Sequence, residues 1–280
     1  MTNRLKSIMG RDLGLDHDGV LICPKGFVAG DFGKQTTLPS PDKVVLLDDF
    51  LGNALNTDVW SATLSDGAST HGTAAVSAAV TDAVGGVYKM STPGTFGSKI
   101  LDMMGIAGVA QWLPTAGGLA MQVRFKFVAG ITTRSLFFGF TNALRTATTS
   151  PLTRATTSNT AGTGSTEVVG VMLNADATEG NVYQLAGIKS AATAVLITTA
   201  LAPVADQYET WRVEINASGV ARFYRNGIVV QQGTTLISLT AATNLVPVFF
   251  TSASSVSSVK VTDLDYIHVV QNRGLDGTAV

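Results

Sequence analysis

Residues 208–231 alternate apolar and polar side chains and interrupt them with two tight turns. The segments WRVEINA and VARFYRN flank the turn NASG (216–219), and the pair Asn226-Gly227 then leads into GIVVQQ. An Asn-Gly pair is the strongest short signal for a two-residue hairpin, because both residues tolerate positive φ. This region therefore predicts antiparallel strands, and it limits the chain to a fold that is built from β-hairpins.

A second stretch, LAMQVRFKFVAG, repeats this alternation near the middle of the chain. It places Met121, Val123, Phe125 and Phe127 on one face and polar residues on the other, as in a half-buried antiparallel strand. Further apolar runs such as VVLLDDF, SLFFGFT and EVVGVMLN predict more strands. In NLVPVFFTSA, Pro247 indicates an edge strand or a bulge, because proline cannot donate a ladder hydrogen bond.

These elements predict an all-β chain, an antiparallel β-sandwich over residues 44–271. One large sandwich of roughly 200–250 residues is common. Residues 74–84 leave helix or strand open, and residues 99–113 allow a strand pair or a short helix. Residues 1–43 predict an irregular extended arm, and residues 272–280 a short tail. Because a terminal arm is ordered only where something holds it, we expect this arm to dock on its own sandwich or on another chain.

Composition restricts the partners. The net charge of −1 gives no electrostatic reason to expect nucleic acid. No signal-peptide core and no apolar run of about 18 residues occurs, so we expect neither secretion by that route nor a membrane anchor. The single Cys23 excludes an intrachain disulfide. The mean hydropathy of +0.28 fits an alanine- and valine-rich chain or a surface covered by neighbouring subunits.

Acidic residues give little support for catalysis. The chain has four glutamates, and Glu209 and Glu214 are separated by five positions, which places them on opposite faces of a strand. A glycanase needs two carboxylates that face the same substrate. Asp263 and Asp265 share a strand face, which predicts either half of a Ca²⁺ site or a structural pair. The three histidines are scattered, so we expect no metal site and no cofactor.

Residues 141–166 almost lack large apolar side chains, so they predict either a flexible surface insertion or a contact loop. Tryptophans offer flat surfaces that can stack on sugars. Trp60 and Trp211 fit core positions, whereas Trp112 fits either the core or an exposed site. The candidate contact residues for a glycan or a partner are Trp112, Arg145 and Arg154.

Several motifs together resemble a known fold family. They are DDFLG (48–52), LNT (55–57), Trp60, Tyr208, Trp211, FYRNG (223–227) and DY (265–266). In this order they are similar to the concanavalin A-like lectin/glucanase jelly-roll module of tailed-bacteriophage virion structural proteins. The resemblance covers residues 44–271 and implies a concanavalin A-like jelly roll. The acidic motif Glu-x-Asp-x-x-Glu of the jelly-roll β-glucanases does not occur in this chain.

The resemblance implies a non-enzymatic capsid decoration (cement) protein, made in the host cytoplasm and located on the capsid surface. Its expected partners are the major capsid protein or other virion proteins and further copies of itself, such as a trimer. The arm would dock on the capsid through Arg4, Lys6, Arg11, Phe27 and Phe32. The alternative is a receptor- or glycan-binding module of a tail fibre or spike, with a host-surface glycan as ligand. A secreted glycan-processing enzyme is the least supported interpretation.

Overall fold

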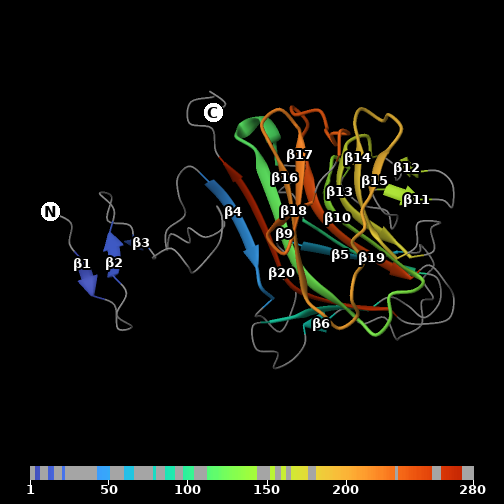
Figure 1. The fold of residues 1–280 in the computed structure, drawn as a ribbon, viewed down its shortest axis with the longest axis horizontal. Coiled ribbons are helices and arrows are strands. Elements are labelled where there is room, and N and C mark those ends of the chain that lie inside the picture. The colour runs from blue at the N-terminus through green and yellow to red at the C-terminus, as the bar shows by residue number, and fades with distance from the viewer. Residues whose placement is uncertain are drawn as a thin grey trace.

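Two antiparallel β-sheets pack face to face and form the body of the molecule (Figure 1). The computed structural model describes residues 4–6, 12–15, 21–22, 43–50, 60–65, 78–79, 86–91, 97–103, 112–143, 152–154, 159–161, 165–175, 181–230, 233–253 and 260–272. Within these ranges, no helix is both long enough and apolar enough to cross a membrane. The predicted all-β sandwich is confirmed.

The seven-stranded sheet consists, in order, of β15 (Val195–Thr198), β14 (Tyr183–Ile188), β13 (Val168–Asn174), β10 (Arg134–Thr141), β19 (Val246–Ala253), β8 (Gly97–Met103) and β5 (Trp60–Ser65). The eight-stranded sheet consists of β18 (Ile228–Val230), β17 (Ala221–Arg225), β16 (Glu209–Ile215), β9 (Leu119–Val128), β20 (Val261–Asn272), β7 (Tyr88–Ser91) and β6 (Ala78–Ala79), with β4 (Lys43–Asp48) also paired to β20. The first strand of the sandwich, β4, thus pairs with the last.

The smaller elements lie outside these two sheets. A three-stranded sheet contains β1 (Arg4–Lys6), β2 (Asp12–Leu15) and β3 (Leu21–Ile22), and a two-stranded one contains β11 (Leu152–Arg154) and β12 (Asn159–Ala161). A short 3-10 helix, η3 (Pro114–Ala116), precedes β9. Figure 1 shows β1–β3 apart from the sandwich, and they pair with neither large sheet.

The core forms where the alternating strands turn their apolar faces inward. Along β9, the predicted inward set from Met121 to Phe127 is at most 1% exposed. Phe125 contacts Phe138 and Phe249 of the opposite sheet, with both ring centroids 5.6 Å away. Trp211 of β16 is fully buried, which confirms its predicted core position. The two sheets therefore meet through an aromatic layer at the centre of the sandwich.

Both turns predicted in the C-terminal third are confirmed. Asn226 and Gly227 have φ values of 50° and 81°, as a two-residue hairpin requires, and they join β17 to β18. Asn216 closes the other turn, because its side-chain oxygen accepts hydrogen bonds from the backbone N–H groups of Ser218 and Val220. These two turns fix the register of β16, β17 and β18.

The structure corrects the expectation for Pro247. Its strand, β19, is not an edge strand but lies between β10 and β8. The described pairing of β19 with β8 begins only at Val248, and Pro247 pairs with Phe140 of β10. Pro247 is the second residue of β19, ahead of the described pairing with β8, and proline is best tolerated near the start of a strand.

The outer face of the seven-stranded sheet carries a second apolar cluster. Its members come from β10, β13, β14, β19 and β11, and none is more than 5% exposed: Phe137, Leu152, Val168, Met172, Ala186, Ile188, Val248 and Phe250. Leu152 belongs to the stretch 141–166, which predicted a surface insertion or a contact loop. At this residue the stretch instead packs against the sheet, with Leu152 only 2% exposed.

One buried cation also ties the sheets together. Arg134 of β10 is fully buried and reaches β20, where its Nη1 donates to the Val261 carbonyl at 2.9 Å and to Thr262 Oγ1 at 2.7 Å. Its guanidinium carbon lies 4.5 Å from the ring centroid of Phe127. Burial lowers the pKa of Arg134 to about 10, so the group remains charged at neutral pH.

Candidate functional site

The outward side of the eight-stranded sheet, called the outer face below, carries the polar residues that alternate with the core. Strand register sets these side chains in rows across the sheet. One row contains Arg222, Glu214, Ala120, Val270 and Val45. The next row contains Tyr224, Arg212, Gln122, His268 and Leu47. Residues from five strands, from β4 near the start of the sandwich to β20 at its end, thus form one continuous surface.

Tyrosine rings and cations contact each other on this face. The guanidinium carbon of Arg212 lies 4.3 Å from the ring centroid of Tyr224. Arg124 and Lys126 both lie over Tyr208, at 4.4 and 4.9 Å. Partial burial raises the pKa of Tyr208 and of Tyr224, so both hydroxyls stay protonated and can donate hydrogen bonds. These contacts hold the rings in place, as a binding surface requires.

The paired aspartates of β20 belong to the same face. Asp265 forms an ion pair with Arg124, and Asp263 lies 3.4 Å from Lys126 Nζ. A bulge between Leu264 and Tyr266 shifts the register beside Asp265. Both carboxylates therefore neutralise cations of β9. Within the described residues, no group of three or more His, Cys, Asp or Glu side chains could hold a metal ion.

A pocket of 380 Å³ opens on the outer face above Ala120. Ala120, with its small methyl side chain, lies in the row between Glu214 and Val270, and all three residues line the pocket. At the end of the pocket the chain turns at Gly117, which has a φ of 119°. A Cβ at Gly117 would lie 2.9 Å from Asn272 Cβ, so glycine keeps this end wall compact.

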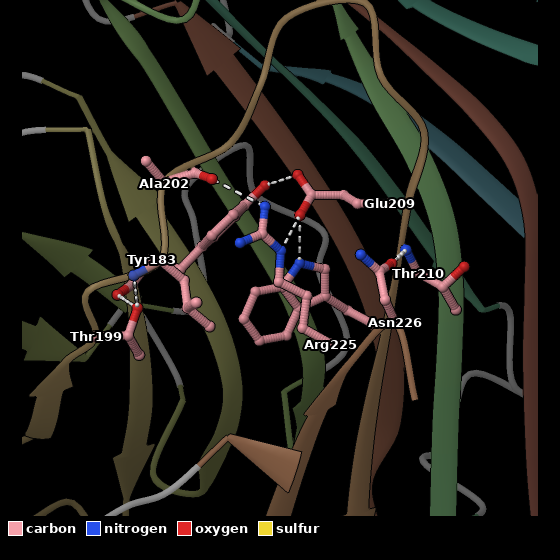
Figure 2. A network of polar contacts seen from close by, with 9 residues as sticks. Tyr183, Thr199, Ala202, Glu209, Thr210, Arg225 and Asn226 are labelled. Atoms are coloured by element: carbon pink, nitrogen blue, oxygen red, sulfur yellow. Dashed lines mark hydrogen bonds and ion pairs between the residues drawn. The ribbon is translucent and has the colours of Figure 1, made fainter. Parts of the chain in front are cut away.

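Glu209 lies inside the sandwich, on the side of β16 opposite to Glu214, as their spacing predicts. Figure 2 shows Tyr183, Glu209 and Arg225 pointing toward one another. Glu209 accepts hydrogen bonds from the Tyr183 hydroxyl, from Trp211 Nε1 at 2.9 Å and from Arg225 Nε at 2.8 Å. Burial, and then the charge of Glu209, raise the pKa of Tyr183 well above its usual value. The network is a structural bridge between β14, β16 and β17.

Glu167 is also engaged by the fold. It is 4% exposed, and its two oxygens accept hydrogen bonds from the backbone N–H groups of Ser190 and Thr240, each at 2.9 Å. Glu214 is the remaining described glutamate, and its Oε1 lies 2.8 Å from Arg212 Nη2. The described glutamates thus lie in three different places and do not face one another across a cleft.

The structure corrects one predicted contact residue. Trp112 is 4% exposed and belongs to the main core, so its ring has no free face for a sugar. Its backbone forms a bridge with Leu245, with the two N–H···O hydrogen bonds at 3.1 and 2.7 Å. This bridge draws the segment before η3 into the sandwich, which is the reason for its burial.

Other predicted residues are not placed by the structure. Arg145, Arg11, Phe27 and Phe32 lie outside the described residues, as do Cys23 and Glu179. For Arg4, Lys6, Arg154 and Trp60, the structure describes the strand but not the side chain. The contact and capsid-docking roles of these residues therefore stay predictions.

The sequence analysis missed the rows on the outer face. A signal was present, because the two turns that flank β17 fix its register against β16. Counting back from the turn at residues 216–219 places Arg212 opposite Tyr224 and Glu214 opposite Arg222. The contributions of β9 and β20 have no such local signal.

No protein-family model and no curated protein matches this sequence. Solved structures match its fold. A variant of LamA from Z. galactanivorans, solved with laminaritriose and laminaritetraose, is 10% identical, with 82% of this chain and 99% of the other covered and a TM-score of 0.55. A glycoside hydrolase family 16 endo-glucanase from Bacteroides ovatus is 8% identical, with coverages of 80% and 99% and a TM-score of 0.53. The carbohydrate recognition domain of Emp47p is 10% identical, with coverages of 85% and 100% and a TM-score of 0.50.

The fold is a concanavalin A-like jelly roll. The fold predicted by the sequence resemblance is thereby confirmed. At this level of identity the likeness extends to the fold and no further, because one fold serves many functions. None of the three matched structures is described as a virion protein, so the expected virion role rests on the sequence resemblance.

Proposed function

We propose that this jelly roll is a non-catalytic glycan-binding module, and that the outer face of its eight-stranded sheet is the binding surface. The observation that carries the proposal is the pocket above Ala120, lined by Glu214 and Arg222, on the face where cations also lie over the rings of Tyr224 and Tyr208. Two matched structures support a sugar as the ligand, because one is described as an oligosaccharide complex and the other as a carbohydrate recognition domain.

The chemistry of this face suits a sugar. A pyranose presents apolar C–H faces and a ring of hydroxyls, so it needs flat apolar contacts and both donors and acceptors nearby. Ala120 and Val270 supply an apolar floor. Glu214 supplies acceptors, and Arg222, opposite it on β17, supplies donors.

A non-catalytic role fits the positions of the carboxylates. Glycoside hydrolysis needs two carboxyl groups about 5–5.5 Å or about 6.5–9.5 Å apart across the scissile bond. Glu209 and Glu167 are bound within the protein by hydrogen bonds. Asp263 and Asp265 are neutralised by Lys126 and Arg124. These contacts favour binding without cleavage.

Affinity electrophoresis in gels that contain neutral or acidic polysaccharides tests the proposal, with release of reducing ends measured on the same samples. We expect retardation by at least one polysaccharide and no release of reducing ends. Tyr224→Ala should weaken the retardation, whereas Val195→Ala, at an exposed site on β15 of the other sheet, should leave it unchanged. Release of reducing ends, or no retardation in any gel, would contradict the proposal.

A second candidate function is the expected virion decoration. The observation that favours it is the separate sheet β1–β3, which pairs with neither large sheet within the described residues. The exposed apolar side chains of Val45 and Leu47 follow directly on the next strand, β4. Deletion of residues 1–43 should leave a folded jelly roll that no longer binds undecorated phage heads. Retained binding by the truncated chain would exclude docking through the arm.

A further inference from the structure

We propose that the pocket above Ala120 is a subsite for an acidic sugar, with Arg222 binding the carboxylate and Glu214 binding ring hydroxyls. The inference rests on the proposed glycan-binding function and narrows its ligand to one chemical class. It concerns the outer face of the eight-stranded sheet alone, and it depends on the charges and the shape of the pocket.

The Arg222 guanidinium can bind a ligand carboxylate. It lies on β17 directly opposite Glu214, and its side chain is exposed. Glu214 is already engaged on its other side by Arg212 Nη2 at 2.8 Å and by the Tyr224 hydroxyl. Within the described part of the chain, Arg222 makes no ion pair. Its planar guanidinium therefore presents parallel donors, which match a carboxylate in a bidentate contact.

The Glu214 carboxylate favours singly charged anions over doubly charged ones. Glu214 lies beside Arg222 in the same row and repels a doubly charged group such as phosphate. A sugar acid carries one negative charge, and its hydroxyls can donate to the free lone pairs of Glu214. The net charge of −1 offers no long-range attraction for polyanions, so binding must depend on this local match.

The pocket also has the size and rim of a monosaccharide site. Its volume of 380 Å³ lies in the range of small-ligand pockets, about 300–1,000 Å³. Asn216 and Asn272 lie on the rim, and the fold holds each through one end of its amide. Asn216 uses its oxygen for the turn, and Asn272 uses its nitrogen to donate to the Gly117 carbonyl at 3.0 Å. Within the described residues, the other end of each amide has no hydrogen bond and can contact ligand hydroxyls.

Matched polymers provide the test. Polygalacturonate and its methyl-esterified form share one backbone and differ in the free carboxylate, and binding of each is measured by isothermal titration at constant ionic strength. We expect the acidic polymer to bind at least about ten times more tightly, since the bidentate contact is a charge-assisted one. Free galacturonate should compete with polygalacturonate for binding. Inorganic phosphate at the same concentrations should not compete.

Three variants and one control locate the site. Arg222→Leu and Ala120→Leu should each weaken binding of polygalacturonate about ten-fold or more, by loss of the cation and by filling of the pocket. Arg222→Lys should retain part of the affinity, because it keeps the charge and loses the planar fork. Lys189→Leu removes an exposed cation that directly follows β14 of the other sheet, and it should leave the affinity unchanged.

The outcomes separate the two proposals. Equal binding of both polymers with no effect of Arg222→Leu would overturn the acidic-sugar subsite and leave glycan binding standing. Competition by phosphate as strong as by galacturonate would overturn the selection for a sugar acid. No binding of any acidic or neutral polysaccharide would contradict the glycan-binding function itself, and the subsite with it.

Discussion

Glu209 and Arg225 form an ion pair inside the jelly roll, with Arg225 Nε donating to Glu209 Oε2 at 2.8 Å (Figure 2). Their side chains are only 6% and 18% exposed. Trp211 and Tyr183 donate to the same carboxylate, so one charge satisfies three donors from three strands. The Glu209 carboxylate therefore joins β16 and β17 to Tyr183 of the other sheet, and its loss would leave several buried groups without partners.

Glu209→Gln should destabilise the protein strongly. Removing one partner of a buried ion pair costs about 3–5 kcal/mol, because the other charge stays buried without compensation. We expect a loss of this size in urea-induced unfolding. Glu214→Gln is the matched control, since the Glu214 side chain lies on the outer face of the same strand and is 32% exposed, against 6% for Glu209. A pair in contact with solvent contributes about 0–1 kcal/mol. Equal losses in the two variants would show that Glu209 does not have the role assigned to it.

Trp112→Ala should act on stability and not on a binding surface. Trp112 belongs to the main core, and truncation of a buried tryptophan to alanine costs about 3–5 kcal/mol. We expect the same range for Trp211→Ala. Thermal and urea unfolding of both variants measures this loss. If Trp112→Ala left the stability unchanged and abolished glycan binding, Trp112 would have to lie at the surface.

Gly139→Ala should disrupt the pairing of β10 with β13. Gly139 lies directly opposite Gly170, and a Cβ at Gly139 would be 2.2 Å from the Val169 carbonyl oxygen. The strands must separate, and overpacking of this kind costs about 1–3 kcal/mol in addition to the strain of a positive φ.

Gly130→Ala is the control for that variant. Its φ is also positive, but a Cβ there would meet nothing within 4 Å. We expect Gly130→Ala to lower the free energy of unfolding only by the cost of a positive φ in alanine, about 1–2 kcal/mol. If differential scanning calorimetry gave both variants the same loss, the close approach of the two strands would not be important for stability.

Local patterns were sufficient for the strands and turns of the C-terminal third. The alternation along β9 predicted the buried side chains from Met121 to Phe127 because side chains of a strand point to opposite faces in turn. Asn226-Gly227 predicted a hairpin because few other residues adopt two successive positive φ values. Each signal depends on neighbouring residues alone.

The candidate site depends on pairings that local patterns do not encode. The pocket brings Ala120 together with Glu214 on one side and with Val270, which is 150 positions along the chain, on the other. Trp112 is buried through a bridge to Leu245. The local sequence around Trp112, with a proline and a glycine nearby, is compatible with a core position and with a surface position. Only the bridge to Leu245 decides between the two. Without the strand order, the sequence could predict neither the pocket above Ala120 nor the burial of Trp112.

His268 should make the folded protein sensitive to mild acid. It lies in the outer-face row between Gln122 and Leu47, and burial lowers its pKa from 6.5 to about 4. Between these two pH values the unfolded chain binds a proton that the folded chain does not. The free energy of unfolding therefore falls as the pH drops from 6.5 toward 4, and the stabilisation is fully present above pH 6.5.

The melting temperature of the wild type and of His268→Gln, measured from pH 7.5 to pH 4.5, isolates this contribution. All carboxylates are common to both proteins, so their titration cancels in the difference. We expect the wild type to lose more stability on acidification, and the curves of the two proteins to converge or cross below pH 6. Parallel curves over the whole range would show that His268 binds its proton equally well in the folded and the unfolded chain, and would place its imidazole in contact with solvent.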